Sequence, residues 1–336
     1  MRIEIRNSIK EFDSQWDTLI SSVYQKRSFL LHAEKYNPCQ QRYYLGYNDD
    51  NQLVSGAVVY TSKVNVLTFA KYCINLPMTI IGIPVSVDAP GVVGENFYFP
   101  ELINAIFKAE EGIILCNNYE SKIPLKDIIE MQTLPTLIRN GFEVSWEAYL
   151  KTLRHGYRRR ILKAESKFKN INTIETSCME FSEEHYNLYL NIMNRTKTKI
   201  ETLSKFFFIE LPKEFRLHSF YSNNQLITWH ISIFEKETYY FLFGGINYEL
   251  RDKYDAYYNN LIQIIKEAIR LKSKTVNFGQ TSEVSKNRLG AKFMKKKMFL
   301  FHKSTLLRLI FQYCKNVLSY EIKSTEVNIY KKKLQT

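Results

Sequence analysis

Two stretches far apart in the chain carry the same pattern. Residues 42–60 read RYYLGYNDDNQLVSGAVVY, and residues 216–234 read RLHSFYSNNQLITWHISIF. Each begins with an aromatic-rich run, passes through a turn of Asn with Asp or Ser, and opens a second run at Asn-Gln-Leu. Two β-rich runs around such a turn predict an antiparallel hairpin. The hairpin therefore occurs twice, which indicates an internal repeat.

The repeat continues beyond the hairpins. In the first half, apolar residues at helical spacing predict a helix at 101–110, followed by a strand at 112–116. The second half repeats this order with a helix at 256–271 and a strand from Thr275. We therefore predict an α/β chain of two tandem units. The 336 residues are long for one core and suit two.

Composition limits the class of protein and its partners. The five cysteines are scattered and odd in number, so neither a disulfide framework nor a CxxC metal site can be identified, and a reducing cytoplasm is the simpler inference. Met1 leads directly into an alternating strand, and no apolar run approaches the roughly 20 residues of a membrane span. We expect a protein without a transmembrane segment, either free in the cytoplasm or peripheral to the inner membrane face.

The formal net charge of +13 favours an acidic partner. An acyl carrier protein, tRNA, the phosphates of coenzyme A (CoA) and an anionic lipid surface all satisfy this condition. The charge does not choose among them.

Residues 229–303 are the most informative stretch. A second hairpin run breaks at Gly244-Gly245, where a strand that splays or admits a ligand beside its backbone needs residues without a Cβ. Asp255 stands at the N-cap position of the helix that follows, so the first turn presents free N–H groups. A strand that opens beside a helix N-terminus is a candidate anion site.

The order of elements in this stretch, with NFGQTSEVSKNRLGAKF at residues 277–293, resembles the acyl-CoA N-acyltransferase (GNAT) superfamily. The similarity is to its FemAB-like and BioF-like acetyltransferase members, which hold tandem GNAT units. It implies mixed, mostly antiparallel sheets flanked by helices. It also implies that residues 137–142, like 287–293, end a helix and turn into a final strand. The chain lacks the Arg/Gln-x-x-Gly-x-Gly/Ala phosphate loop of single-domain GNAT enzymes.

The resemblance also implies a division of labour between domains. We expect a degenerate N-terminal GNAT-like domain at 1–147 and a basic connecting helix at 148–170. The C-terminal GNAT-like domain at 171–336 is expected to hold the thioester site and to end in an amphipathic helix. For that last helix, which begins near Leu306, packing on the domain and lying on a membrane surface are both open.

The family's donor site maps onto the second unit. By resemblance, the pantetheine arm of the acyl donor lies along the strand that ends at the glycine pair, and its phosphates meet the next helix N-terminus. The expected binding residues are Phe243, Gly244, Gly245, Tyr257, Tyr258, Lys286 and Arg288. For Lys286 and Arg288, a surface helix without a ligand is the alternative.

His230 is the first candidate for a general base. It faces opposite to Trp229 and Ile231 by the period of two, and an imidazole titrates near working pH. A core histidine satisfied by its neighbours is an equal alternative. Glu283, Asp255 and Tyr254 are the next candidates, and Tyr254 or Tyr258 is the candidate acid for the departing sulfur. The six histidines are isolated and show no HExxH pattern, so no metal is expected.

Three functions remain open at this stage. The first is an N-acyltransferase that uses an acyl-CoA or acyl-carrier-protein thioester and a primary amine acceptor. The second is a FemAB-type ligase that uses aminoacyl-tRNA to extend a peptide on a cell-wall precursor, which the resemblance and the basic charge favour. The connecting helix either binds an anion or is a solvated helix between two domains, and both remain open; its six cations are Arg154, Arg158, Arg159, Arg160, Lys163 and Lys167. The third is a non-catalytic binding protein on the same scaffold.

Overall fold

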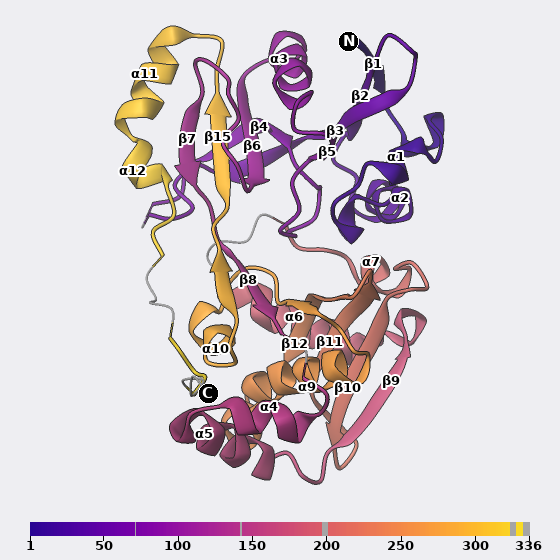
Figure 1. Cartoon of the computed structure of the whole chain (residues 1–336), viewed down its shortest axis with the longest axis vertical. Coiled ribbons are helices and arrows are strands. Elements are labelled where there is room, and N and C mark those ends of the chain that lie inside the picture. Colours follow the sequence, from indigo (N-terminus) through magenta and orange to yellow (C-terminus); the bar gives the residue numbers. More distant parts are fainter. Residues whose placement is uncertain (71, 142, 197–200, 323–326, 332–336) are drawn as a thin grey trace, which may run out of the picture. The chain divides into compact units, whose positions relative to one another are not determined.

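The computed structural model describes residues 1–70, 72–141, 143–196, 201–322 and 327–331. Within that part, the chain forms two compact units, each built around its own sheet (Figure 1). The first unit takes residues 1–134, 201–207 and 295–321. The second takes the described residues of 135–196, 208–294 and 322–331.

The sheet of the first unit is mixed and mostly antiparallel. Its strand order is β1-β2-β3-β4-β6-β15-β7, with β5 beside β3, and only β4 and β6 among these described neighbours run parallel. The strands are β1 (Arg2–Arg6), β2 (Arg42–Tyr47), β3 (Leu53–Asn65), β4 (Asn75–Ile81), β5 (Val92–Gly94), β6 (Ile113–Tyr119), β7 (Ile129–Gln132) and β15 (Lys297–Phe301).

Helices cover this sheet. The amphipathic helix α3 buries Leu102, Ile103 and Ile106 against the strands. The helices of this unit are η1 (Ile9–Glu11), α1 (Gln15–Thr18), η2 (Val23–Gln25), α2 (Arg27–Tyr36), α3 (Phe99–Ala109), α11 (Thr305–Tyr313) and α12 (Lys315–Leu318). The short helix α7 (Lys205–Ile209) spans the boundary between the units.

The sheet of the second unit follows the same plan. Its order is β14-β8-β13-β12-β11-β10-β9, and β12 with β13 is the parallel pair. The strands are β8 (Thr136–Asn140), β9 (Asn172–Ser177), β10 (Arg216–Ser222), β11 (Gln225–Glu235), β12 (Thr238–Ile246), β13 (Thr275–Asn277) and β14 (Lys292–Met294). The helices are α4 (Trp146–Thr152), α5 (His155–Ser166), η3 (Cys178–Glu180), α6 (Glu183–Arg195), α8 (Arg251–Tyr254), α9 (Ala256–Arg270) and α10 (Glu283–Asn287). No helix in the described residues has the length and apolarity to cross a membrane.

The strand registers confirm the internal repeat. Arg42 pairs with Val59, 17 residues later, and Arg216 pairs with Ser232, 16 residues later. The first turn is one residue longer, which accounts for the difference. Both hairpins also shift register by one residue near the turn. The second turn places Asn223 and Asn224 at φ 45° and 62°, the left-handed region that asparagine tolerates and tight hairpins require.

The two halves of the chain exchange one strand each. β8, from the first half, lies between β13 and β14 in the second sheet, and β15, from the end of the second half, lies between β6 and β7 in the first. Figure 1 shows both crossings. The domain boundaries predicted at residues 147 and 170 divide the chain into continuous pieces, whereas each compact unit also contains an exchanged segment from the other half.

One expectation about the repeat is wrong. Residues 137–142 were expected to end a helix, as residues 287–293 do. Residues 137–140 instead belong to strand β8, which lies antiparallel to β14 with Leu137 opposite Phe293. Phe142 lies outside the described residues. The counterpart of β8 is therefore the exchanged strand β15.

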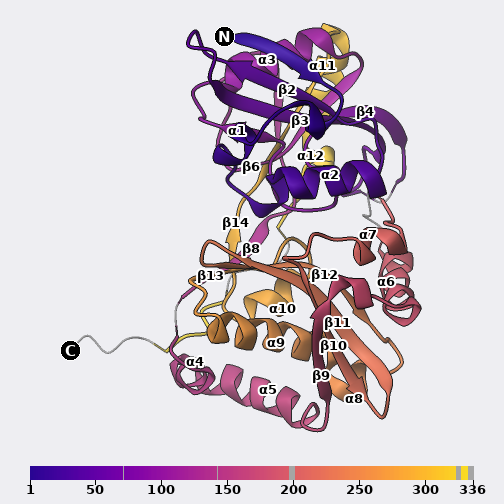
Figure 2. The same cartoon turned by 90° about the vertical axis from the view of Figure 1, so that its right-hand side faces the viewer.

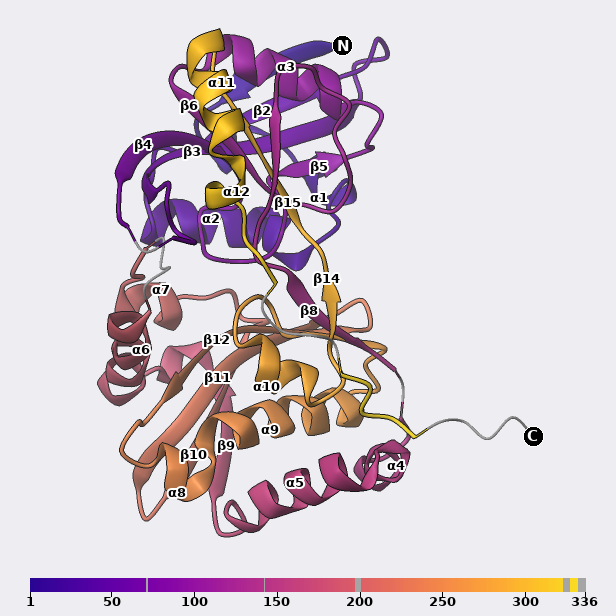
Figure 3. The same ribbon diagram turned by 90° about the vertical axis from the view of Figure 1, so that its left-hand side faces the viewer.

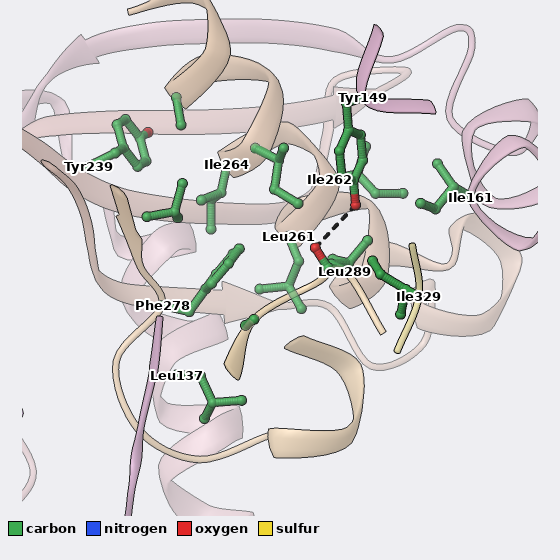
Figure 4. Close-up of a cluster of buried hydrophobic side chains, with 14 of the residues drawn as sticks. Leu137, Tyr149, Ile161, Tyr239, Leu261, Ile262, Ile264, Phe278, Leu289 and Ile329 are labelled. Atoms are coloured by element: carbon green, nitrogen blue, oxygen red, sulfur yellow. Dashed lines mark hydrogen bonds between the residues drawn. The ribbon is translucent and has the colours of Figure 1, made fainter. Parts of the chain in front are cut away.

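The core of the second unit lies between the sheet and its helices. Leu261 and Ile264 of α9 lie in one buried cluster with Tyr239 of β12 and Phe278 after β13 (Figure 4). In the same cluster, the Tyr149 hydroxyl of α4 donates to the Leu289 carbonyl oxygen at 3.1 Å, also drawn in Figure 4. The Asn259 side-chain amide of α9 donates to the Ala164 carbonyl oxygen of α5 at 2.9 Å. Figure 2 shows α5 and α4 beyond α9 as seen from the strands.

The connecting segment forms two helices where one was predicted. α4 ends at Thr152 and α5 begins at His155 because the chain between them is extended: Leu153 bridges Tyr330, and the Arg154 N–H donates to the Ile329 carbonyl. These partners lie far along the chain, which is why the helical spacing of the sequence did not reveal the break.

Gly245 offers a direct test of the packing in this unit. An ideal Cβ there would lie 2.0 Å from Nε1 of the buried Trp229 and 2.9 Å from Cβ of Leu188. We expect Gly245→Ala to lower the free energy of unfolding by about 1–3 kcal/mol through overpacking. Urea denaturation would measure it. Gly156→Ala, in α5 with nothing within 4 Å of the added carbon, is the control and should leave stability unchanged or raise it. Equal effects of the two would contradict the packing described.

Candidate functional site

The parallel strands β12 and β13 separate soon after they begin. β12 pairs with β11 from Thr238 to Ile246 but with β13 only from Thr238 to Tyr240, opposite Thr275 to Asn277. In the described residues no strand pairs with the β13-facing edge of residues 241–246. We call this opening, made by residues 241–246 of β12 and 278–282 after β13, the fork. The backbone groups on this edge are left for side chains, water or a ligand.

A β-bulge in β12 coincides with the start of the fork. Phe241 pairs with Ser232 and Phe243 with Ile231, so Leu242 is an extra residue on β12. A bulge increases the local twist and turns a strand away from its neighbour. The bulge therefore accounts for the separation on the β12 side.

On the other side, the chain leaves β13 through a turn of unusual backbone. Gly279, Thr281 and Ser282 have φ of 65°, 64° and 53°, and the last two are rare for residues with a Cβ. The turn is tied to β8, since the Phe278 N–H donates to the Leu137 carbonyl and the Leu137 N–H to the Gly279 carbonyl. The β8 strand of the first half thus holds one side of the fork.

The glycine pair has a different place from the one expected. The strands part at residue 241, three residues before Gly244. The Trp229 ring occupies the space beside Gly245, and a Cβ on Gly244 would lie 2.9 Å from the Trp229 carbonyl oxygen. The two glycines make room for the neighbouring strand and its indole, while the bulge at Leu242 makes the opening.

Helix α10 stands at the fork. The Lys286 ammonium is buried and donates to the carbonyl oxygens of Phe278 and Gln280, each at 2.6 Å. It also lies 5.8 Å from the centroid of the Phe241 ring. Lys286 therefore links the turn after β13 to the first open residue of β12. Glu283 is buried in the same helix, and Arg288 follows it, half-buried.

The start of α9 supplies three further predicted residues. Asp255 occupies the N-cap position but its side chain does not cap the helix; it forms an ion pair with Lys167 at 3.0 Å. Burial raises the pKa of Tyr257 to about 12, although a hydrogen bond with Ser282 at the fork opposes the rise. Burial likewise raises the pKa of Tyr258 to about 12. Both phenols are protonated at neutral pH and are available as donors.

Tyr258 lies among cations. The Arg160 guanidinium of α5 stands over its ring, 5.5 Å from the centroid, and both Arg160 and Arg288 lower the pKa of the phenol, against the larger effect of burial. The buried hydroxyl oxygen has no hydrogen-bond partner in the described residues. Two guanidiniums around an unpaired phenol at a helix start can receive an anion.

His230 lies apart from this group, in a buried polar network between β11 and α9. Its Nδ1 is 2.6 Å from Oδ1 of Asn260, and its Nε2 is 3.3 Å from the Tyr239 hydroxyl. The imidazole is 1% exposed and stacks on His218 with centroids 4.5 Å apart. Burial, and then the neighbouring His218, lower the pKa of His230 well below its usual value. It is therefore a neutral imidazole at neutral pH.

Apart from His230, the predicted side chains fall into three places. Lys286, Arg288, Tyr257 and Tyr258 gather at the fork and the start of α9. Phe243 points to the opposite face of the sheet, where it meets Tyr189 and Phe208. Tyr254 donates to Ser222 of β10 at 3.0 Å, and β10 lies two strands from β12.

Sequence reasoning missed several neighbours of the fork. Phe241 lies within β12, a strand of ordinary composition, and Ser282 follows β13, where the local signal is Asn277-Phe278-Gly279 at the strand end. Arg160 was grouped with the connecting helix. In the described residues, no cluster of three potential metal ligands occurs.

Comparison with solved structures places this geometry in a known fold. No protein-family model matches the sequence, and a search of curated proteins finds no match. FemX superposes with a TM-score of 0.57 at 13% identity, over 93% of this chain and 100% of FemX. The chain has the FemX fold. A conserved protein of unknown function from Bacteroides thetaiotaomicron superposes with a TM-score of 0.51 at 12% identity, over 89% of this chain and 100% of that one.

The likeness to FemX confirms the predicted fold class, and it bears out the resemblance to FemAB-like proteins as a similarity of fold. Two mixed, mostly antiparallel sheets with flanking helices are present, as expected for tandem GNAT-like units. At 13% identity the likeness extends to the fold and not to the chemistry. The chemistry must come from the fork and its neighbours.

The buried His230 predicts how stability depends on pH. Its folded pKa lies below the usual value of the unfolded chain, so below pH 6.5 the unfolded state binds a proton that the folded state does not. Its contribution to stability is complete above pH 6.5 and falls by about 1.4 kcal/mol per pH unit below it, down to the folded pKa. We expect the free energy of unfolding, measured by urea denaturation from neutral to mildly acidic pH, to fall less steeply with pH in His230→Gln than in the wild type. Equal slopes would contradict this.

Proposed function

We propose that the chain is an N-acyltransferase that moves an acyl group from a CoA or acyl-carrier-protein thioester to a primary amine. The observation that carries the proposal is the fork, where β12 offers backbone groups to an extended ligand beside the start of α9. A pantetheine arm has the amides to use that edge as a missing strand would. Its acyl end would then lie at the bulge, and its phosphates would point toward α9.

The phosphate end of the donor has a matching set of groups. In this proposal Arg288, Arg160 and the unpaired Tyr258 hydroxyl bind the phosphates at the start of α9, where the helix dipole also favours negative charge. Lys286 holds the turn after β13 in place. This set would replace the glycine-rich phosphate loop that the chain lacks.

The reaction needs few groups from the protein. The amine nitrogen attacks the thioester carbonyl carbon, the C–S bond breaks, and one amine proton ends on the departing thiolate. Backbone N–H groups at the bulge would stabilise the developing oxyanion. Tyr257, hydrogen-bonded to Ser282 at the fork, replaces Tyr254 as the proposed acid for the sulfur because Tyr254 lies against β10.

His230 remains the proposed base, and it would act through the Tyr239 hydroxyl. The neutral imidazole has one unprotonated nitrogen at neutral pH, and Tyr239 lies near the start of the strand that forms the fork. Glu283 in α10 is the competing choice. Asp255 is less suited because Lys167 already neutralises it.

A second donor is favoured by a separate observation. Helix α5 and its N-cap expose four cations to solvent: Arg154, Arg159, Arg160 and Lys163. The one acid of the helix, Glu165, forms an ion pair with Lys266 at 2.6 Å. An exposed row of guanidiniums suits a phosphate backbone. Aminoacyl-tRNA in a FemAB-type reaction is therefore the alternative donor, and its ester carbonyl would take the place of the thioester.

Ligand-induced stabilisation separates these proposals. Thermal unfolding would be followed with acetyl-CoA, a longer acyl-CoA, holo-acyl carrier protein and tRNA. We expect a CoA thioester or the carrier protein to stabilise the chain, by about 2.7 kcal/mol at 100 times its dissociation constant. A response to tRNA alone would support the alternative donor. No response to any of the four would favour a binding protein without this chemistry.

Arg288 tests the phosphate end of the site. Loss of a charge-assisted hydrogen bond predicts that Arg288→Gln weakens binding of the acyl-CoA about tenfold, measured by calorimetry. Lys272→Gln, at the far end of α9 and exposed, is the charge-matched control. If both variants bind as the wild type does, the phosphates do not lie at the start of α9.

His230 and Glu283 are compared in a turnover assay. With free thiol release measured on a panel of primary amines, we expect His230→Gln to lower kcat at least tenfold, the usual contribution of a general base, and Glu283→Gln to lower it less. Far-ultraviolet circular dichroism confirms that each variant is folded. A smaller loss in His230→Gln than in Glu283→Gln would move the base to α10.

A further inference from the structure

Helix α11 and the short helix α12 carry an apolar face that points outward from the first unit. No residue of α11 is buried. The outward side chains are large and recur at helical spacing: Leu306, Leu309, Ile310, Tyr313 and, in α12, Val317. Tyr313 is 92% exposed, and Leu306 and Leu309 are 67% and 63% exposed. Exposed apolar side chains gathered on one helix face mark an interaction surface.

The other side of the same helices is packed, so this surface has a fixed orientation. Phe311, Cys314 and Leu318 contact the cluster formed by Met131 of β7 and Met298 of β15, among others. Figures 1 and 3 show α11 and α12 lying along these two strands. The helices are therefore held to the sheet by one face, and the apolar residues of the other face are presented as a set.

A second element adds apolar residues beside α12. The loop between β3 and β4 contacts the chain just after α12, where the ring centroid of Phe69 lies 5.1 Å from that of Tyr320. The same loop exposes Tyr72 and Ile74. Two separate chain segments thus present large apolar side chains in this part of the unit.

The charge of the segment is of one sign. Residues 303–320 contain Lys303, Arg308 and Lys315 and no carboxylate. Two of these cations pair with acids from other segments of the first unit. The Arg308 guanidinium lies 3.5 Å from the Asp127 carboxylate, and the Lys303 ammonium lies 2.5 Å from the Glu111 carboxylate. Within the segment itself the apolar face is accompanied by cations only, and Lys315 is the one that forms no ion pair in the described residues. This composition is that of a helix that lies in the interface of an anionic bilayer.

We propose that the face formed by Leu306, Leu309, Ile310, Tyr313 and Val317 docks on an anionic lipid surface. The apolar side chains enter the interface between headgroups and acyl chains, and the cations of the same segment remain with the headgroups. A second copy of the chain would cover the same apolar side chains, but the segment 303–320 of that copy would offer the Lys315 ammonium no carboxylate. The proposal is independent of the acyltransfer chemistry, since it concerns the first unit alone.

The test uses the full chain and sedimentation with lipid vesicles. Vesicles of phosphatidylcholine containing about one-third phosphatidylglycerol are compared with phosphatidylcholine alone. We expect binding to the anionic vesicles that weakens as salt is raised. Leu309→Gln with Tyr313→Gln should weaken it by about tenfold or more, because two large apolar groups leave the interface. Lys315→Gln should weaken it less.

The control pair is Ile5→Gln with Phe97→Gln, two exposed apolar residues of the same unit outside this face. It should bind as the wild type does, and sedimentation equilibrium should find the wild type monomeric without lipid. Failure of the wild type to bind, equal binding to the neutral vesicles, or full binding by the Leu309/Tyr313 variant would overturn the proposal. A wild-type dimer that the Leu309/Tyr313 variant dissociates would assign the face to a second copy instead.

Discussion

Each strand of a sheet has two edges, and the N–H and C=O groups of both must be satisfied by a neighbour, by water or by a ligand. β12 meets this condition on its β11 edge from Thr238 to Ile246 except at the bulge of Leu242, and it loses its strand partner on the β13 edge after Tyr240. The bulge at Leu242, the left-handed turn at Thr281 and Ser282, and the Lys286 contacts to two carbonyl oxygens all act at this point. The proposed binding of an extended donor depends on that open edge.

The exchange of strands explains how the fork is kept open. β13 has only three residues in the ladder, and it would be a weak edge without β8 on its other side. β8 comes from the first half of the chain and holds the turn after β13 through Leu137. β15 is the reciprocal strand in the first sheet. Each sheet is therefore completed by a segment of the other half, so neither half of the sequence alone can supply the whole of its sheet.

Much of the fold was predictable because its causes are local. The turn and the flanking strands of the Asn-Gln-Leu hairpins specify their register. The apolar residues of 256–271 recur at helical spacing, and those that the spacing places on one face, such as Leu261, Ile264 and Ile265, are the ones buried in α9. The strand exchange was not predictable, because the residues of β8 resemble the end of a helix through their likeness to 287–293, and nothing in the five residues of β15 indicates which sheet they join. The break between α4 and α5 depends on Ile329 and Tyr330, far along the chain.

The candidate site was predictable only in part. Lys286, Arg288, Tyr257 and Tyr258 come together because the short α10 and the start of α9 both follow the strands of the fork. The glycine pair was wrongly predicted to open the sheet, because the two glycines make room for the neighbouring strand and its Trp229 indole. The bulge at Leu242 arises from the register between two strands, which composition does not encode.

The most direct measurement is hydrogen exchange, by mass spectrometry, of the backbone amides of residues 241–246 with and without a non-hydrolysable acyl-CoA analogue. The fork predicts that the amides of this segment that face away from β11 exchange rapidly in the free protein and become protected when the analogue binds, while β10 and β11 change little. If those amides are already protected in the free protein, or stay unprotected while the analogue is bound, the donor does not pair with β12 and the account is wrong.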